Sequence, residues 1–276
     1  MPYDYTNELE DVKKFYSNDP LQKRFSLLLT GETNAGKTYI LRTARFPIHI
    51  DSFDPGGTKC LKDLIRSEDN PKGQIIADTK WEKDDPFEPD KFDKWKKAMD
   101  LRFEIDYFSH FGTYCLDSAT TWGEAVMNYG LKSRGRAGEV PQHRKDYNPQ
   151  KVEMTNYIRK MMNLPCDFIL TGHLRENRKT LYLDTKTGIS KDEVTYRFYT
   201  TGQAVVTIPL LFDEIYVLKG RGEDPKRELL TDSLGEYIAR SRLKGSGNLK
   251  SKEEPNIKEI LKKCGFDTND KPKLEA

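Results

Sequence analysis

One eight-residue segment, Gly31–Thr38, constrains the fold of this 276-residue chain more than any other. It reads Gly-Glu-Thr-Asn-Ala-Gly-Lys-Thr, a G-x-x-x-x-G-K-T pattern between the short apolar run Phe25–Leu29 and the helical pattern Tyr39–Arg42. Two glycines at this spacing let backbone N–H groups close around a phosphate, and a strand before and a helix after are the context of such a loop. The segment therefore predicts a phosphate-binding loop, known as a Walker A motif.

Residues of this loop have separate predicted roles. Gly31 and Gly36 permit the tight turn, Lys37 places a positive charge on the β- and γ-phosphates, and the Thr38 hydroxyl is offered to Mg²⁺. The ligand implied is a nucleoside triphosphate with its magnesium ion. The predicted nucleotide contacts are Gly31, Glu32, Thr33, Asn34, Ala35, Gly36, Lys37, Thr38 and Tyr39.

Apolar runs bounded by turn residues recur along the chain and alternate with helical patterns. The predicted strands are Phe25–Leu29, Ile48–Ile50, Thr113–Leu116, Phe168–Thr171, Val205–Ile208 and Ile215–Leu218. Trp122–Tyr129 and Val152–Met162 place apolar residues at three- and four-residue steps, which predicts helices. Alternation of this kind indicates a three-layer α/β fold with a mostly parallel central sheet. The acidic stretch Trp81–Asp90 is expected to be a surface loop leading into a solvated helix.

The length accommodates one principal domain, expected at residues 24–244 after an N-terminal extension at 1–23. Gly-Ser-Gly-Asn from Gly245 has the composition of a linker, and the amphipathic pattern Ile257–Lys263, closed by Gly265, predicts a short helix. Residues 245–276 are therefore expected to be a tail added to the main domain.

Composition excludes several classes of protein. Lys and Arg number 46 against 44 Asp and Glu, so the net charge of +2 does not announce a polyanionic partner, and any basic patch must be local. The four cysteines form no C-x-x-C pair, which favours reduced core residues. Neither a signal-peptide pattern nor an apolar stretch near 18 residues occurs, so we expect a soluble, cytoplasmic protein without a membrane partner.

A nucleotide hydrolase also needs a carboxylate at the end of the strand beside the loop strand, where it holds Mg²⁺. Asp117, which directly follows the apolar run Thr113–Leu116, fits that role and is the predicted metal residue together with Thr38. His173 stands at the end of another predicted strand and could contact the γ-phosphate, or have no role.

Two further aspartates are candidates for orienting the attacking water. Asp51 and Asp54 follow the predicted strand Ile48–Ile50, and Gly56-Gly57 would let this loop lie close to the phosphates. The same residues could equally cap a turn. The sequence leaves the choice between Asp51 and Asp54 open, with a preference for Asp54.

With these pieces in order, the chain resembles the RecA-like phage ATPases, the group that contains the phage single-strand annealing and recombination-associated ATPases. The match extends from Arg24 to Leu243 and rests on Gly31–Thr38, Asp51–Lys59, Leu116-Asp117-Ser118 with Thr120-Thr121, Leu170–His173, Ile208-Pro209, Phe212–Glu214 and Ala239–Arg242. The resemblance implies ATP and Mg²⁺ as cofactors, a switch role for His173, and assembly into a ring or short filament. The family's catalytic glutamate is replaced here by Asp51 and Asp54, which puts strong hydrolysis in doubt.

The resemblance also implies contact with single-stranded DNA through two segments, Lys132–Tyr147 and Arg175–Thr201. Their basic residues, the predicted nucleic-acid contacts, are Lys132, Arg134, Arg136, Arg144, Lys145, Arg175, Arg178 and Lys179. Tyr147 and Tyr199 are available to stack on bases. Arg240 and Arg242 match cations that reach the γ-phosphate of a neighbouring subunit, although a solvated basic strip would look the same.

The favoured function is a Mg²⁺- and ATP-dependent RecA-like ATPase that binds single-stranded DNA and assists phage recombination or replication. A single-stranded-DNA-binding protein is a further candidate partner. Two alternatives remain: a nucleotide-dependent switch that acts on a protein partner, and a small-molecule kinase. The segment Lys179–Tyr199 favours an extended hairpin over the arginine-rich lid of a kinase.

Overall fold

The computed structural model describes residues 5–18, 23–66, 74–183, 190–200, 202, 204–221, 224–246 and 248–274. Helices lie at α1 (Thr6–Asn18), α2 (Lys62–Arg66), α3 (Lys91–Glu104), α4 (Ala119–Lys132), α5 (Tyr147–Met161), α6 (Ala204–Thr207) and α7 (Ile257–Lys263). Strands lie at β1 (Ser26–Gly31), β2 (Ile48–Ser52), β3 (Ile75–Asp78), β4 (Thr113–Asp117), β5 (Asp167–Leu183), β6 (Ser190–Tyr199), β7 (Glu214–Arg221), β8 (Asp224–Leu230), β9 (Arg240–Ser241) and β10 (Lys252–Glu253).

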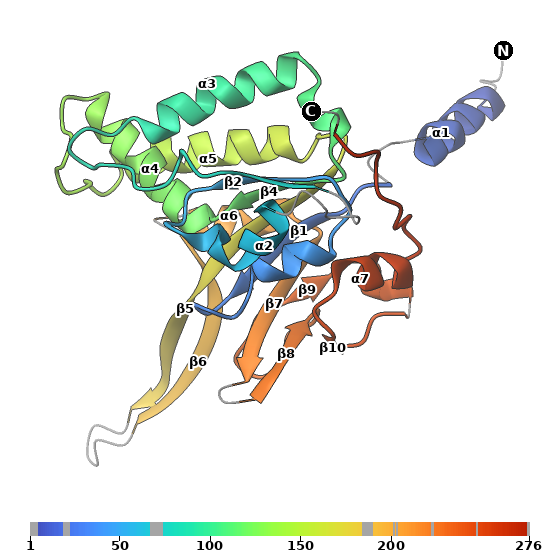
Figure 1. The fold of residues 1–276 in the computed structure, drawn as a ribbon. Coiled ribbons are helices and arrows are strands. Elements are labelled where there is room, and N and C mark those ends of the chain that lie inside the picture. The colour runs from blue at the N-terminus through green and yellow to red at the C-terminus, as the bar shows by residue number, and fades with distance from the viewer. Residues whose placement is uncertain are drawn as a thin grey trace.

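A single twisted sheet runs through the molecule (Figure 1). Its strand order is β10-β8-β7-β1-β5-β4-β2-β3, with β6 paired to β5 and β9 to β7. The six strands from β7 to β3 are parallel, which confirms the predicted mostly parallel sheet. One detail differs from the sequence expectation: β5 lies between β1 and β4, so the Asp117 strand is one place removed from the loop strand.

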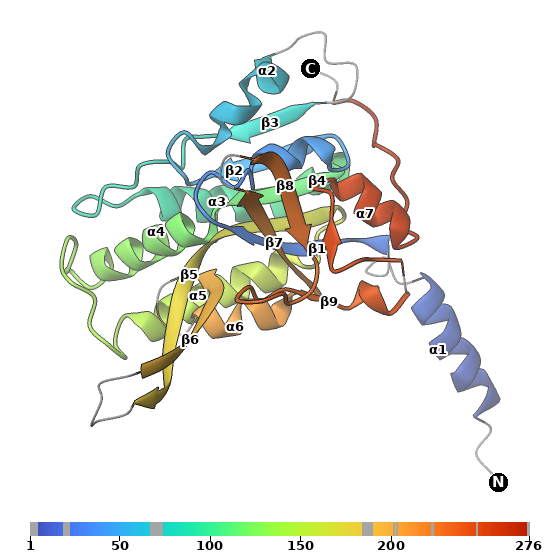
Figure 2. The ribbon, with the colours of Figure 1, turned by 90° about the horizontal axis from the view of Figure 1, so that it is seen from below.

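Side chains alternate between the two faces of the sheet and build two apolar layers. Leu28, Leu116 and Phe168 face the layer formed by α3, α4, α5 and α6. Their neighbours Leu27, Cys115 and Ile169 face the opposite layer, which includes α7 and the short 3₁₀ helix at Tyr39–Thr43. Figure 2 shows the helices on both sides of the strands. The chain has the three-layer α/β fold predicted from its alternating pattern.

Two predicted elements are different in the structure. Val205–Ile208 lies in α6 and the turn after it, because Ala204 and Ile208 are buried four residues apart while Val206 is 64% exposed, which is helical spacing. The helix after the acidic loop is not fully solvated. Its residues Phe92, Trp95 and Met99 are buried in the core.

The C-terminal tail belongs to the main body of the molecule, in contrast to the expected appendage. β10 extends the sheet by pairing with β8, and Ile257, Ile260 and Leu261 of α7 are buried in the second apolar layer. The predicted helix Ile257–Lys263 is present, and the Asn256 side chain accepts a hydrogen bond from the Glu259 N–H at its start. Gly247 of the predicted linker lies outside the described residues.

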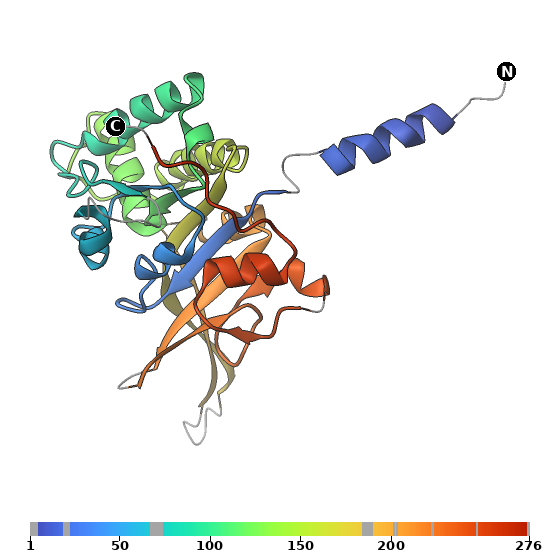
Figure 3. The ribbon, with the colours of Figure 1, turned by 45° about the vertical axis from the view of Figure 1, so that its right-hand side comes forward.

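The N-terminal helix α1 stands away from the body (Figure 3). Its side chains are exposed from Thr6 through Ser17. None of the helices in the part of the chain described here is both long and apolar enough to cross a membrane.

Candidate functional site

The phosphate loop connects β1 to the 3₁₀ helix at Tyr39–Thr43, and its carbonyl oxygens surround the Lys37 ammonium. Lys37 is 6% exposed, and its Nζ donates to the carbonyl oxygens of Gly31 at 3.0 Å and Glu32 at 2.9 Å. Burial lowers the pKa of Lys37, although the nearby Asp117 and Asp54 carboxylates act in the opposite direction. The ammonium is thus held among the loop carbonyls, where the phosphates of a bound nucleotide can replace them as partners.

Asp117 reaches the phosphate loop from the end of β4 despite the intervening strand. Its Oδ2 accepts a hydrogen bond from the Thr38 hydroxyl at 2.7 Å, and its Oδ1 accepts one from Thr171 at 2.5 Å. Asp117 is fully buried, and burial together with the charge of Asp54 raises its pKa against these two hydrogen bonds. Two neighbouring carboxylates beside a hydroxyl form an oxygen donor set that fits Mg²⁺, because a divalent cation would relieve their repulsion.

Asp54 lies beside Asp117 on the loop after β2. Its Oδ1 accepts hydrogen bonds from the Ser118 hydroxyl at 2.8 Å and the Thr121 hydroxyl at 2.5 Å. His173 Nε2 lies 3.4 Å from Oδ2. Burial alone would raise the pKa of Asp54, but the hydrogen bonds from His173, Thr121 and Ser118 lower it. The result is an ionised carboxylate, partly open to solvent, within the cluster formed by the P-loop, Asp117 and His173.

A residue missed by the sequence reasoning, Glu82, fastens the loop that carries Asp54. Its Oε1 accepts from the Ser52 hydroxyl at 2.9 Å, and its Oε2 accepts from the Gly56 N–H at 2.8 Å. A Cβ on Gly57 would lie 3.2 Å from the Asp54 Cβ and 3.5 Å from Asp117 Oδ2, so this loop packs against Asp117. Glu82 lies in the acidic stretch that the sequence predicts to be a surface loop, and no local pattern distinguishes it from its acidic neighbours.

Asp51 does not join this cluster. Its fully buried carboxylate accepts hydrogen bonds from Trp81 Nε1, Trp95 Nε1, the Tyr114 hydroxyl and Arg102, at 2.8–3.0 Å. Burial alone would raise the pKa of Asp51, but His49, Arg102 and Tyr114 lower it strongly. With every lone pair occupied by a structural donor, Asp51 has no free atom with which to hold water.

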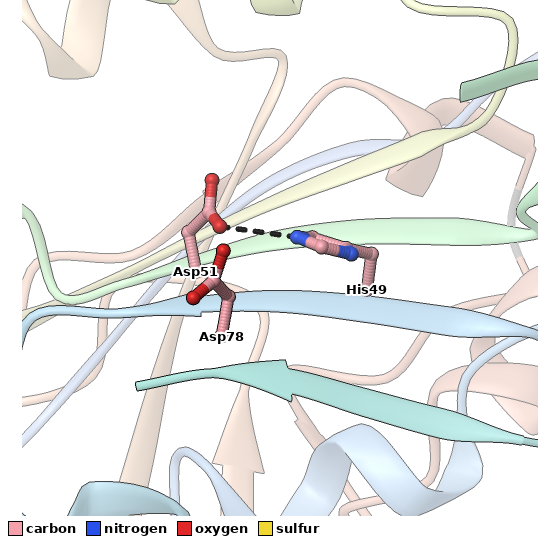
Figure 4. A group of neighbouring side chains, drawn as sticks. All are labelled: His49, Asp51 and Asp78. Atoms are coloured by element: carbon pink, nitrogen blue, oxygen red, sulfur yellow. Dashed lines mark hydrogen bonds and ion pairs between the residues drawn. The ribbon is translucent and has the colours of Figure 1, made fainter. Parts of the chain in front are cut away.

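His49, Asp51 and Asp78 bring one ligand atom each within 4.8 Å of the others, which is the spacing of a metal site (Figure 4). However, His49 Nε2 already lies 3.0 Å from Asp51 Oδ1, and the Arg102 guanidinium bonds both Asp51 and Asp78. Arg102 therefore supplies the positive charge of this group, and we assign the cluster a structural role.

Arg240 and Arg242 lie away from the phosphate loop of their own chain. Arg240 pairs with Ile215 of β7, which is level with Leu28 of β1, three residues before Gly31. At 3.3 Å per residue this is about 10 Å along the sheet. The Arg240 guanidinium donates to the carbonyl oxygens of Pro209 and Phe212, whereas Arg242 is 64% exposed and paired with Asp213. Only contact with a neighbouring subunit would bring either to a nucleotide.

The basic segment Lys132–Tyr147 divides into two parts. Arg134 and Arg136 both form ion pairs with the buried carboxylate of Asp146. Lys132 donates to the carbonyl oxygen of Pro89 at 2.9 Å. These three residues hold the segment together, and Arg144 and Lys145 are the exposed cations that remain without an ion pair among the described residues.

The second predicted DNA-contacting segment, Arg175–Thr201, belongs to a long antiparallel hairpin of β5 and β6. This agrees with the sequence, which favours an extended hairpin over a kinase lid. Arg178 is paired with Glu176 at 3.1 Å, while Arg175 and Lys179 are exposed on β5. Residues 184–189 and 201 of this segment lie outside the described residues.

Both segments meet in one cavity of about 690 Å³. It is lined by His143, Arg144, Tyr147, Asn148, Arg175, Tyr199, Thr200, Gly202 and Val205. The Arg175 guanidinium lies 5.6 Å from the centre of the Tyr199 ring. Aromatic rings beside exposed arginines offer both a stacking surface and positive charge.

Thr120 links this cavity to the phosphate site. Its hydroxyl donates to the carbonyl oxygen of Tyr199 at 2.9 Å and lies 3.4 Å from the His173 N–H, which donates to it. His173 in turn contacts Asp54. A short chain of hydrogen bonds therefore connects the cavity wall to the carboxylate beside Asp117.

No protein-family model matches the sequence, and no curated protein matches it significantly. Solved structures align with it at low identity. A KaiC-like protein from Pyrococcus horikoshii is 14% identical with a TM-score of 0.37, over 79% of this chain and 81% of that chain. The flagellar accessory protein FlaH from Methanocaldococcus jannaschii is 16% identical with a TM-score of 0.36, over 78% and 84%.

An ATPase from the type III secretion system of pathogenic bacteria is 15% identical with a TM-score of 0.43. The alignment covers 71% of this chain and 52% of the secretion ATPase, so this chain spans about half of it. At these identities and TM-scores, the function of this chain is inferred from its own side chains.

Proposed function

We propose that this chain is a RecA-like, Mg²⁺-dependent ATPase that binds single-stranded DNA and uses ATP in phage DNA recombination or replication. The observation that carries the ATPase part is the contact of Thr38 with Asp117 at 2.7 Å, beside the ionised Asp54. It joins a phosphate loop, a metal carboxylate and a candidate water-orienting carboxylate in one cluster.

The chain's own residues account for the reaction as follows. Backbone N–H groups of the loop and the Lys37 ammonium bind the phosphates. Thr38 and Asp117 would hold the magnesium ion, which neutralises charge on the β- and γ-phosphates when bound. Asp54 orients a water molecule and accepts its proton, and its hydrogen bond to His173 reports the state of this carboxylate to β5.

The cavity between the two basic segments supports the DNA part of the proposal. Arg144 and Arg175 supply charge for backbone phosphates, and Tyr147 and Tyr199 supply faces on which bases can stack. The hydrogen bonds of Thr120 offer a route by which DNA at this cavity would affect Asp54.

A salt titration of single-stranded DNA binding tests this assignment. The triple substitution Arg144→Ala, Lys145→Ala and Arg175→Ala should weaken binding for all sequences, and should reduce the slope of log affinity against log salt by roughly 0.7 per lost phosphate contact. The matched control removes three other exposed cations, Lys80, Lys94 and Lys97, which are 61%, 61% and 74% exposed. Equal slopes in the wild type and the cavity variant would contradict DNA binding here, and ATP turnover that ignores DNA would favour a switch that acts on a protein.

Assembly into a ring or short filament is part of the proposal. Helix α1 exposes Leu9, Val12 and Tyr16, which recur at helical spacing and are 49%, 60% and 65% exposed. A 13-residue helix is marginal by itself in water, so this stripe is expected to pack against a second copy of the chain. Light scattering of the wild type and of Leu9→Ser with Val12→Ser tests this; a wild type that is monomeric at high concentration with ATP and DNA would contradict it.

A further inference from the structure

A second cavity of about 690 Å³ opens beside the phosphate loop, on the side of Gly36 and Tyr39. Tyr39 and Arg42 line one wall directly after the loop. Arg227 of β8 and the tail residues 252–256 line the opposite walls. The cavity is thus assembled from three parts of the chain that lie far apart in the sequence and meet at the Walker A motif.

Arg227 lies against the backbone of the phosphate loop. A Cβ built on Gly36 would be 2.2 Å from an Arg227 Nη1, and the guanidinium is 5.8 Å from the centre of the Tyr39 ring. Gly36 has a φ of +99°, a backbone conformation that favours glycine.

The positive charge of Arg227 is not neutralised within the described part of the chain. Lys252 pairs with Glu228 at 3.4 Å, and Glu253 is held by Lys263, so these charges of the cavity wall are matched. Arg42 contacts the Tyr39 hydroxyl and Arg227 faces the Tyr39 ring, and neither guanidinium has a carboxylate partner among the described residues.

We propose that this cavity binds the nucleoside part of the triphosphate, with the base packed against Tyr39 and Arg227 and the tail forming the outer wall. The inference rests on the proposed ATPase function. Lys37, Thr38 and Asp117 mark the end of the loop at which the terminal phosphate and metal are held. The nucleoside leaves at the opposite end of the triphosphate, and the cavity beside Gly36 and Tyr39 receives it there.

Size and chemistry agree with this ligand. The volume falls within the range of small-molecule sites, which is about 300–1,000 Å³. A tyrosine ring that is 40% exposed and a planar guanidinium both present flat faces to a base. The tail, whose strand β10 pairs with β8, would contact the bound nucleoside directly.

Binding of ATP and of inorganic tripolyphosphate, each with Mg²⁺, separates the nucleoside contribution from that of the phosphates. The wild type should bind ATP at least tenfold more tightly than tripolyphosphate. Tyr39→Ala and Arg227→Ala should each reduce this ratio severalfold, whereas Tyr39→Phe should preserve it. The matched controls are Tyr5→Ala and Arg159→Ala, exposed residues that do not line the cavity.

Hydrogen exchange gives a readout that needs no variant. Residues 252–256 should be protected by ATP and not by tripolyphosphate. An unchanged affinity ratio in both alanine variants, or equal protection by the two ligands, would overturn the nucleoside pocket while leaving the ATPase proposal intact. A wild type that binds neither ligand would overturn both.

Discussion

Asp51 and Asp54 stand three residues apart at the end of the same strand, yet they belong to different environments. Asp51 is 0% exposed and is enclosed by two tryptophans, a tyrosine and Arg102. The Asp54 side chain is 21% exposed and meets the Ser118 and Thr121 hydroxyl groups and His173, beside Asp117. Both carboxylates have a lowered pKa: His49, Arg102 and Tyr114 lower that of Asp51, and hydrogen bonds from His173, Thr121 and Ser118 lower that of Asp54.

The difference follows from the alternation of a strand. Ile48 and Ile50 face the layer that contains α7, so His49 and Asp51 face the layer that contains α3. Asp54 lies past the strand end, where the backbone is free to turn toward the phosphate loop. The same type of side chain is therefore part of a buried hydrogen-bond network at one position and lies beside the phosphate-loop cluster at the other.

The largest expected effect is on folding. Asp51→Ala removes the main partner of Arg102, whose side chain is only 12% exposed. The substitution should lower the free energy of unfolding by about 3–5 kcal/mol. Asp54→Ala, the matched variant, should change it by less than about 1 kcal/mol. Denaturant titrations of both proteins measure this. Similar losses of unfolding free energy in the two variants would contradict a structural role that belongs to Asp51 and not to Asp54.

Next in size is the effect of Asp54→Asn on catalysis. Turnover should fall about 100-fold, because the amide cannot accept the proton of the attacking water, while ATP affinity stays within about twofold. Asp63→Asn, on the exposed face of α2, serves as the control. Full turnover in Asp54→Asn would place the catalytic base elsewhere.

A smaller effect is expected from Glu82→Gln. The amide has one acceptor oxygen in place of two, so it cannot accept from both the Ser52 hydroxyl and the Gly56 N–H. Turnover should fall about fivefold, which corresponds to about 1 kcal/mol, and ATP affinity should not change. Glu88→Gln in the same exposed loop is the control. A fall in affinity without a change in turnover would show that Glu82 does not act through Asp54.

The smallest effect is a dependence on pH. The folded pKa of Asp51 lies below its unfolded value of about 3.9, so its contribution to stability is complete above that pH and is lost as the pH falls toward the folded pKa. The difference in unfolding free energy between wild type and Asp51→Asn should be constant from pH 7 to about 5, and smaller by about 0.4 kcal/mol near pH 3.9. If the difference in unfolding free energy already declined at pH 6, the pH dependence would have to come from a group other than Asp51.

Local patterns predicted the parts of the molecule that local chemistry determines. The phosphate-loop pattern, Asp117 at a strand end and the helix α7 before Gly265 are each determined by a few consecutive residues. Partners distant in sequence could not be predicted. Asp51 meets Arg102, Gly36 meets Arg227, and the insertion of β5 beside β1 is set by packing across the whole sheet.

The basic segment shows the same limit on a smaller scale. The family resemblance and the local charge predict eight cations as DNA contacts, but Arg134 and Arg136 are paired with the buried Asp146. Whether a cation is available depends on the carboxylates that folding brings to it. Arg144 and Arg175 remain candidates because the fold gathers them, with two tyrosines, around one cavity.

Steady-state release of phosphate from ATP by the wild-type chain, with and without single-stranded DNA, tests the central claim most directly. The account predicts turnover that requires Mg²⁺, is abolished by Lys37→Ala, and rises when DNA occupies the cavity lined by Arg144, Arg175 and Tyr199. Turnover that persists in Lys37→Ala, or a chain that releases no phosphate under any of these conditions, would contradict it.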